Sequence, residues 1–195
     1  MPGIAILSGG QSSRMGINKA LASLNGAKVI EYILARLQPR FDELLIVTNE
    51  PELFEKYPAR VITDIYPRKG PIAGIHAALK TTSQAQLFVL SCDMPFINAD
   101  VINYMLERAQ GYDSVVPVLG GRLQPTAAVY NQSCLPLLID CLEKDKLKLT
   151  RIFEDLNALY LDETVFSCFG QVSELFFNIN DPAALEKARE IAGRG

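Results

Sequence analysis

The chain has 195 residues, of which 49% are hydrophobic and 21% charged, and its formal net charge is −3. This composition suits one large α/β domain, residues 1–195, with a sizeable buried core. It excludes a global basic field for nucleic acid, and no apolar run approaches the roughly 20 residues that a membrane-spanning helix needs. We therefore expect a cytoplasmic protein with no nucleic-acid or membrane partner.

Predicted strands and helices alternate over the first two thirds of the chain, which is typical of βαβ units in a mostly parallel sheet. In chain order, strands are predicted at 4–7, 44–48, 60–63, 87–91 and 114–118, and helices at 29–38, 72–80 and 99–110.

The pattern changes in the last third, where shorter strands predominate. We predict strands at 126–130, 158–161 and 175–177, and helices at 133–144 and 182–192. No repeat or linker interrupts the chain, so this part is expected to elaborate the same domain.

Cysteine and histidine usage excludes several kinds of site. The four cysteines form no C-x-x-C pair, which argues against a zinc ribbon or a thioredoxin motif and predicts free thiols. A single histidine, His76, rules out any site that needs two imidazoles.

The first predicted strand ends in a segment rich in glycine, hydroxyls and cations. Residues 7–19 read Leu-Ser-Gly-Gly-Gln-Ser-Ser-Arg-Met-Gly-Ile-Asn-Lys. Bare backbone N–H groups and cations suit a polyphosphate, and an open α/β sheet binds ligands at the carboxyl ends of its strands. The spacing matches neither the Walker A loop nor the dinucleotide fingerprint. An ordinary glycine turn with solvated Arg14 and Lys19 is the alternative, but the hydroxyls and cations together favour a phosphate site.

Asp93 follows the strongly apolar strand 87–91, and Pro95 holds the turn after it. Its carboxylate is therefore expected at the same sheet edge as the glycine segment, where it could bind Mg²⁺ beside phosphates. An Asx turn or the N-cap of the next helix is an alternative that position alone leaves open.

Asp64 lies at the carboxyl end of the short strand 60–63. Downstream, Gly70-Pro71 is expected to open a helix with Pro71 at N1, and Gly74 allows close backbone approach. Such a helix start could take a base edge or a ribose hydroxyl through main-chain hydrogen bonds. Taken alone, Gly-Pro is favoured as an ordinary helix start.

Two asparagines near the carboxyl end are further candidates. Asn178 and Asn180 would alternate on one face of the predicted strand, with both amides directed at one ligand, and Asn180 could offer an oxygen to Mg²⁺. A cap of the last helix by Asn180 or Asp181 is the alternative and does not exclude the ligand role. Gln124, before the strand 126–130, gives a weaker signal.

In combination these segments resemble the molybdenum cofactor guanylyltransferases, the MobA family. Residues 7–19 are similar to its signature L-x-G-G-x-S-x-R-M-G-x-[DN]-K, residues 70–74 to its G-P-L-A-G segment and residues 92–96 to its C-D-x-P-[FY] segment. The segments at 124–126 and 177–182 match two later stretches, in the family's order, so the resemblance covers nearly the whole chain.

The resemblance implies a Rossmann-like, three-layer α/β/α nucleotidyltransferase fold with a mostly parallel sheet and helices on both faces. It implies transfer of GMP from GTP to molybdopterin, which forms the guanine dinucleotide cofactor and releases pyrophosphate, with Mg²⁺ as cofactor. Cofactor-biosynthesis proteins or molybdoenzyme chaperones are implied as transient partners.

Site roles also follow from the resemblance. The nucleotide-binding set comprises Leu7, Ser8, Gly9, Gly10, Lys19, Asp64 and Gly74. Asp93 would hold Mg²⁺, Arg14 would face the triphosphate, and Gln124, Asn178 and Asn180 would lie on the pterin side. The chain departs from the family at Ser8, where alanine is usual, and at Asn18, where aspartate is frequent. The family often contacts the nucleotide near Thr48-Asn49, and the sequence does not choose between these two residues.

Other functions remain as alternatives. A relative could use CTP on the same cofactor or act on a sugar or polyol phosphate, but Gly9 and the segment 70–74 favour guanine over the CTP pattern L-A-A-G. A non-catalytic nucleotide-binding module has less need of Lys19 and a metal ligand at Asp93. The attacking phosphate is already ionised, so catalysis needs positioning and charge neutralisation without a general base, which fits the scarcity of histidine.

Overall fold

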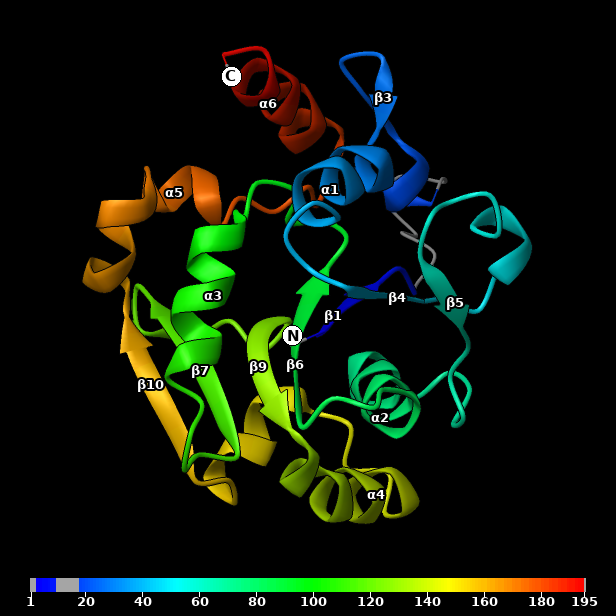
Figure 1. Ribbon diagram of the computed structural model, residues 1–195, viewed down its shortest axis with the longest axis vertical. Coiled ribbons are helices and arrows are strands. Elements are labelled where there is room, and N and C mark those ends of the chain that lie inside the picture. The colour runs from blue at the N-terminus through cyan, green and yellow to red at the C-terminus, as the bar shows by residue number, and fades with distance from the viewer. Residues whose placement is uncertain (1–2, 10–17, 195) are drawn as a thin grey trace.

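A computed structural model describes residues 3–9 and 18–194 of the chain. Strand β1 (Gly3–Leu7) lies in the middle of the sheet, parallel to β4 (Glu43–Val47) on one side and to β6 (Gln86–Ser91) on the other (Figure 1). Within the described residues the order is β10-β7-β9-β6-β1-β4-β5, with β8 on β7. The remaining strands of this sheet are β5 (Arg60–Ile62), β7 (Ser114–Leu119), β8 (Arg122–Leu123), β9 (Ala127–Asn131) and β10 (Ala158–Asp162).

The sheet is mostly parallel, as predicted, and its reversed strands are β8 and β9. β9 runs antiparallel to both β6 and β7, and β8 runs antiparallel to β7. Between β7 and β8 the chain turns at Gly120 and Gly121, whose φ angles are 52° and 74°. A tight turn of this kind joins antiparallel strands, whereas a parallel connection needs a longer crossover. The change of pattern in the last third of the sequence therefore corresponds to a change of strand direction.

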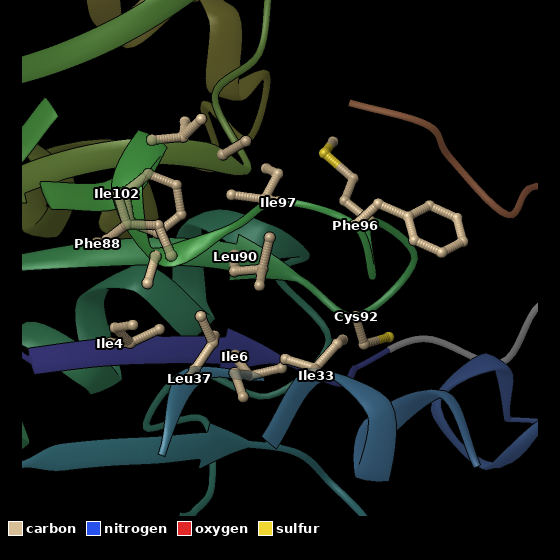
Figure 2. Close-up of a cluster of buried hydrophobic side chains, with 14 of the residues drawn as sticks. Ile4, Ile6, Ile33, Leu37, Phe88, Leu90, Cys92, Phe96, Ile97 and Ile102 are labelled. Carbon is tan, nitrogen blue, oxygen red and sulfur yellow. The ribbon is translucent and has the colours of Figure 1, made fainter. Parts of the chain in front are cut away.

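Helices cover both faces of the sheet. Figure 2 shows the core on one face, where Ile4 and Ile6 of β1 meet Ile33 of α1 (Val29–Leu37) and Ile102 of α3 (Ala99–Glu107). Residues of β1 alternate between the faces, so Ala5 and Leu7 pack instead with α2 (Pro71–Thr81) and α4 (Leu135–Glu143). The three-layer α/β/α arrangement expected from the resemblance is therefore confirmed (Figure 1).

Short elements complete the chain. They are the hairpin of β2 (Ser23–Leu24) and β3 (Ala27–Lys28), the 3-10 helices η1 (Lys19–Leu21), η2 (Pro51–Leu53), η3 (Gln132–Cys134), η4 (Leu149–Glu154) and η5 (Glu163–Phe169), and the helices α5 (Val172–Leu175) and α6 (Pro182–Ala192). Among the described helices, none combines the length and apolar character needed to cross a membrane. All four cysteines have free thiols, as expected.

The prediction of a strand at 175–177 is wrong. Leu175 ends α5, and the amides of Phe176 and Phe177 donate to the carbonyls of Val172 and Glu174, which continues the helical turn. The apolar run is buried by aromatic packing instead of by a sheet, since the rings of Phe176 and Phe166 meet edge to face at 5.0 Å. Burial of this kind and burial in a sheet leave the same apolar signal in the sequence.

Candidate active site

A cleft of about 890 Å³ lies at the carboxyl ends of β1, β4, β5 and β6. This is the edge at which an open α/β sheet leaves room for a ligand, because the connections diverge to opposite faces there. One end, which we call the β1–β6 end, is lined by Ser8, Gly9, Asn18, Lys19, Ser91, Cys92, Asp93, Thr126 and Asn180. The other, the β4–β5 end, is lined by Val47, Asn49, Glu50, Asp64, Arg68, Gly70, Pro71 and Gly74, and Leu7 lies on the floor.

Lys19 joins two oxygen-bearing side chains from distant segments. Its Nζ lies 3.4 Å from Asp93 Oδ2 and donates to Asn180 Oδ1 at 3.3 Å. The Lys19 and Asp93 side chains are each only 18% exposed, so this ion pair is much less screened than a surface pair. We call Lys19, Asp93 and Asn180 the lysine cluster. Lys19 therefore lines the cleft as a mostly buried cation, and its role toward phosphate stays a prediction.

Asn18 explains how Lys19 is held. Its Oδ1 accepts from the amide of Ala20 at 3.1 Å and caps η1, while its Nδ2 donates to Glu50 Oε2 at 3.0 Å. An aspartate here would place a second carboxylate against Glu50. The amide at this position is therefore suited to its neighbour.

Asp93 lies in a turn fixed by main-chain hydrogen bonds. The amide of Cys92 donates to the Leu7 carbonyl at 3.0 Å, and that of Met94 to the Ser91 carbonyl at 3.0 Å. Asn98 caps α3, with its Oδ1 accepting from the Val101 amide at 2.9 Å, so Asp93 is not a helix cap. Asp93 Oδ1 is buried and accepts no hydrogen bond from the described residues. A buried carboxylate oxygen that no described residue satisfies needs a further partner.

The residue before Asn180 is held to the Asp93 turn by a main-chain hydrogen bond. The amide of Ile179, a buried residue, donates to the Asp93 carbonyl at 2.8 Å. The prediction that Asn178 and Asn180 share a strand face is wrong, because residues 177–180 form no strand. Asn178 Nδ2 donates to the Phe176 carbonyl at 3.3 Å and lies outside the cleft lining. Asp181 caps α6 by accepting from the Ala184 amide at 2.8 Å.

At the β4–β5 end, Asp64 and Asn49 form a pair. Asn49 Nδ2 donates to Asp64 Oδ2 at 2.9 Å. Burial raises the pKa of Asp64 above its ordinary value, and the hydrogen bond from Asn49 acts in the opposite direction. Thr48 is buried, and its Oγ1 accepts from the Glu50 amide at 3.1 Å. Of the two residues that the sequence left undecided, Asn49 is therefore the one that faces the cleft.

Gly74 lies where α2 packs closely against the end of β1. A Cβ at this position would lie 3.0 Å from Leu7 Cδ2 and 3.6 Å from Asp64 Oδ1. The missing side chain lets α2 approach β1 closely, as expected. The helix begins at Pro71, directly after Gly70 with a φ of 70°, and both residues line the cleft.

The remaining residues predicted for the site differ in where they lie. Leu7, Ser8 and Gly9 line the cleft at the end of β1. Gly10 and Arg14 lie outside the described residues. Gln124 is not in the lining: its Nε2 donates to the Arg122 carbonyl at 3.3 Å, and Thr126 is the member of its segment that reaches the cleft.

The family follows from comparison with known proteins. The family model of the MobA-like NTP transferase domain matches residues 4–159. The chain belongs to this family. It is 36% identical to a protein of Pelotomaculum thermopropionicum named "Probable molybdenum cofactor guanylyltransferase", over 96% of this chain and 91% of that protein. It is 31% identical to the molybdenum cofactor guanylyltransferase of Syntrophotalea carbinolica, over 94% of this chain and 89% of that protein.

A solved structure agrees with these relatives. The crystal structure of molybdopterin-guanine dinucleotide biosynthesis protein A from Archaeoglobus fulgidus has a TM-score of 0.89 and 30% sequence identity to this chain. The likeness covers 98% of this chain and 99% of the other. As a member of the MobA-like family, the protein is a nucleotidyltransferase.

The lining of this MobA-like site suits a divalent cation bound together with a phosphorylated substrate. Its described charged residues are the carboxylates Glu50, Asp64 and Asp93 and the cations Lys19 and Arg68. No group of three or more His, Cys, Asp or Glu side chains within residues 3–9 and 18–194 could form a closed metal site. Mg²⁺ commonly binds through one or two protein oxygens plus substrate phosphates and water. The unpartnered Asp93 Oδ1 and the nearby amide oxygen of Asn180 fit that mode.

The cleft also contains residues that sequence reasoning missed. Ser91 and Cys92 precede Asp93 and could have been found as its neighbours. Cys92 is buried, and burial raises the pKa of its thiol to about 12, which keeps the thiol protonated near neutral pH. Glu50 and Arg68 lie in loops without a motif, and only the fold brings them to the cleft.

Proposed function

We propose that the protein transfers GMP from GTP to molybdopterin and releases pyrophosphate, forming the guanine dinucleotide form of the molybdenum cofactor. The observation that carries this proposal is the lysine cluster at one end of the cleft, with Gly74 and the start of α2 lining the other end. The first end suits a polyphosphate and the second a nucleoside. The names of the relatives supply guanine and molybdopterin as the substrates.

The reaction exchanges one phosphorus–oxygen bond for another. An oxygen of the molybdopterin phosphate forms a bond with the α-phosphorus of GTP. The bond from that phosphorus to the bridging oxygen breaks, and its electron pair leaves with pyrophosphate. Two anions must approach each other, so the chain's contribution is to position them and neutralise charge. Lys19 supplies a fixed cation for this purpose, and we assign Arg14 the same role.

We further propose that Asp93 and Asn180 hold Mg²⁺ through their side-chain oxygens, together with substrate phosphates. When bound, the ion supplies positive charge beside the reacting phosphate and the leaving pyrophosphate. The Lys19 ammonium contacts the same two side chains. These contacts hold Lys19 beside the oxygens that we assign to the ion, and main-chain hydrogen bonds hold Asp93 in its turn.

The remaining assignments complete the proposal. Asp64, with Asn49, would contact the nucleoside, and Leu7, Ser8, Gly9 and Gly10 would contact the nucleotide through backbone. Gln124 and Asn178 stay predictions for the pterin side. We place the reaction in the cytoplasm, with transient contacts to proteins that deliver molybdopterin or receive the product, because the product must reach another enzyme to be used.

The proposal is tested by offering the purified protein Mg²⁺ and molybdopterin with each of the four nucleoside triphosphates. Pyrophosphate release and the dinucleotide product are measured. We expect turnover with GTP. Turnover with CTP alone would overturn the choice of donor, and binding of GTP without turnover would indicate a non-catalytic nucleotide-binding module.

A further inference from the structure

We propose that Arg68 reads the guanine base of GTP by donating hydrogen bonds to its O6 and N7 atoms. This inference rests on the proposed function and adds a residue that determines nucleotide specificity. Arg68 belongs to the loop between β5 and α2 and lines the β4–β5 end of the cleft, and no sequence motif marks it.

The loop around Arg68 is anchored on both sides. Before it, Asp64 accepts a hydrogen bond from Asn49, and the ring of Tyr66 meets the His76 ring edge to face at 5.2 Å. After it, Lys69 Nζ forms an ion pair with Asp145 Oδ1 at 2.5 Å. The positions on either side thus contact α2 and the segment that follows α4. Arg68 is exposed and lies between these contacts, beside the cleft.

The conformation of Arg68 is unusual for its residue type. Its φ is 63°, in the left-handed region, where a side chain with a Cβ is disfavoured. The other two non-glycine residues described with positive φ are Asn25 and Asp145, which are types that tolerate this region. Backbone strain of this kind concentrates at ligand sites. An arginine in this conformation beside the cleft points to a use for the side chain there.

Arg68 also differs from the other described cation of the cleft. Lys19 is paired with Asp93, whereas among the described residues no hydrogen bond or ion pair engages the Arg68 guanidinium. If the lysine cluster takes the phosphates, the base lies toward Asp64, Gly74 and Arg68. Guanine presents two adjacent acceptors, O6 and N7, which match the paired donors of arginine, while adenine presents an amino donor next to N7. Arg68 therefore favours guanine over adenine.

The test combines a protein variant with an altered nucleotide. Dissociation constants are measured by titration with Mg²⁺ and without acceptor, for GTP, ATP and 7-deaza-GTP, which lacks the N7 acceptor. Arg68→Gly removes the side chain and suits the left-handed backbone, so the loop should keep its shape. We expect Arg68→Gly to bind GTP roughly 10- to 100-fold more weakly and to lose most of the preference over ATP.

The altered nucleotide locates the contact. Wild-type protein should bind 7-deaza-GTP more weakly than GTP, and Arg68→Gly should bind the two alike. Arg68→Lys keeps the charge without the paired donors and should lose most of the discrimination. An equal loss for all three nucleotides in Arg68→Gly would place Arg68 on phosphate or ribose and overturn the proposal, as would unchanged binding of GTP.

One control separates specificity from general effects. Arg151→Gly removes an exposed arginine of η4 outside the cleft lining. This variant should bind nucleotides like the wild type. A wild-type protein that binds GTP but transfers nothing would refute the proposed function and leave the binding pattern to decide the role of Arg68.

Discussion

Lys19 contacts oxygens from two segments that lie far from it in the chain, Asp93 after β6 and Asn180 before α6. Each contact holds one of the groups that we assign to the metal. One Asp93 oxygen faces Lys19, and the other is buried without a partner among the described residues. At the scale of single residues, we therefore expect the chemistry to depend on this carboxylate more than on any other described group.

Asp93→Asn tests that dependence. The amide keeps the size of the side chain and removes its charge, so we expect the turnover number to fall by roughly a hundredfold or more, as when other fixed transition-state charges are lost. Thermal unfolding should change little. Asp100→Asn is the matched control, because Asp100 is an exposed carboxylate of α3 that pairs with Arg40. Near-normal turnover of Asp93→Asn would refute the metal assignment.

At the scale of elements, β1, β6, α2 and α6 could be predicted from the sequence. β1 and β6 are continuous apolar runs, and α2 and α6 begin at Gly-Pro and Asp-Pro, which are local signals. The same signals failed at Phe176, where an apolar run packs on aromatic rings. They also could not reveal Glu50 and Arg68, whose place in the cleft depends on loops brought together by the fold. The lysine cluster was predictable as three separate residues but not as one contact.

The cap of α6 links an element to the site. Asp181 follows Asn180 and accepts from the Ala184 amide. Asp181→Ala should lower the free energy of unfolding by about 1 kcal/mol, because it leaves a helix amide without its partner. The loosened start of α6 should also release Asn180, so we expect a higher KM for the nucleotide. Chemical denaturation and steady-state kinetics measure the two effects.

Asn98→Ala is the control for this prediction. It removes the corresponding cap of α3 and should cost comparable stability, while the main-chain contact between Ile179 and Asp93 remains. If both variants lost stability but neither changed KM, the position of Asn180 would not depend on the cap of α6.

At the scale of the whole molecule, the last helix packs near the beginning of the described chain. Asn25 Nδ2 donates to the Arg189 carbonyl at 2.7 Å, and the Arg189 guanidinium donates to the Ser23 carbonyl at 3.1 Å. α6 is therefore fastened to the β2–β3 hairpin, close in sequence to Lys19. The site and the global fold share these contacts, so stability and activity should respond together to conditions that loosen α6.

The pH dependence of global stability should report on His76. It is buried on α2, and burial lowers its pKa below the ordinary value of 6.5. Between the folded pKa and 6.5 the unfolded chain binds a proton that the folded chain does not, so stability is full above 6.5 and falls as the pH drops. Denaturant unfolding between about pH 5 and pH 7 should show this slope in the wild type.

His76→Gln removes the titrating group and should flatten that slope. Asp64 has the opposite effect on stability. Its pKa is raised in the folded state, so the folded chain binds a proton at a higher pH than the unfolded chain, and this stabilises the fold as the pH falls. Hydrogen bonding to the Lys28 amide lowers the pKa of Glu31, so its stabilising effect is complete above the ordinary value of 4.5 and is lost only below it. Glu31 therefore adds no slope between about pH 5 and pH 7. An unchanged slope in His76→Gln would show that other groups set the acid sensitivity.

The contact between Lys19 and Asn180 also has a consequence for folding of the nascent chain during translation. The two residues are 161 positions apart, which at about 5–20 residues per second corresponds to roughly 8 to 30 s of translation. During this interval β1 and β6 can already pair, but the ribosome has not yet made the segment that completes the lysine cluster. A nascent chain thus emerges with its nucleotide cleft half built and becomes competent only when its last helix docks.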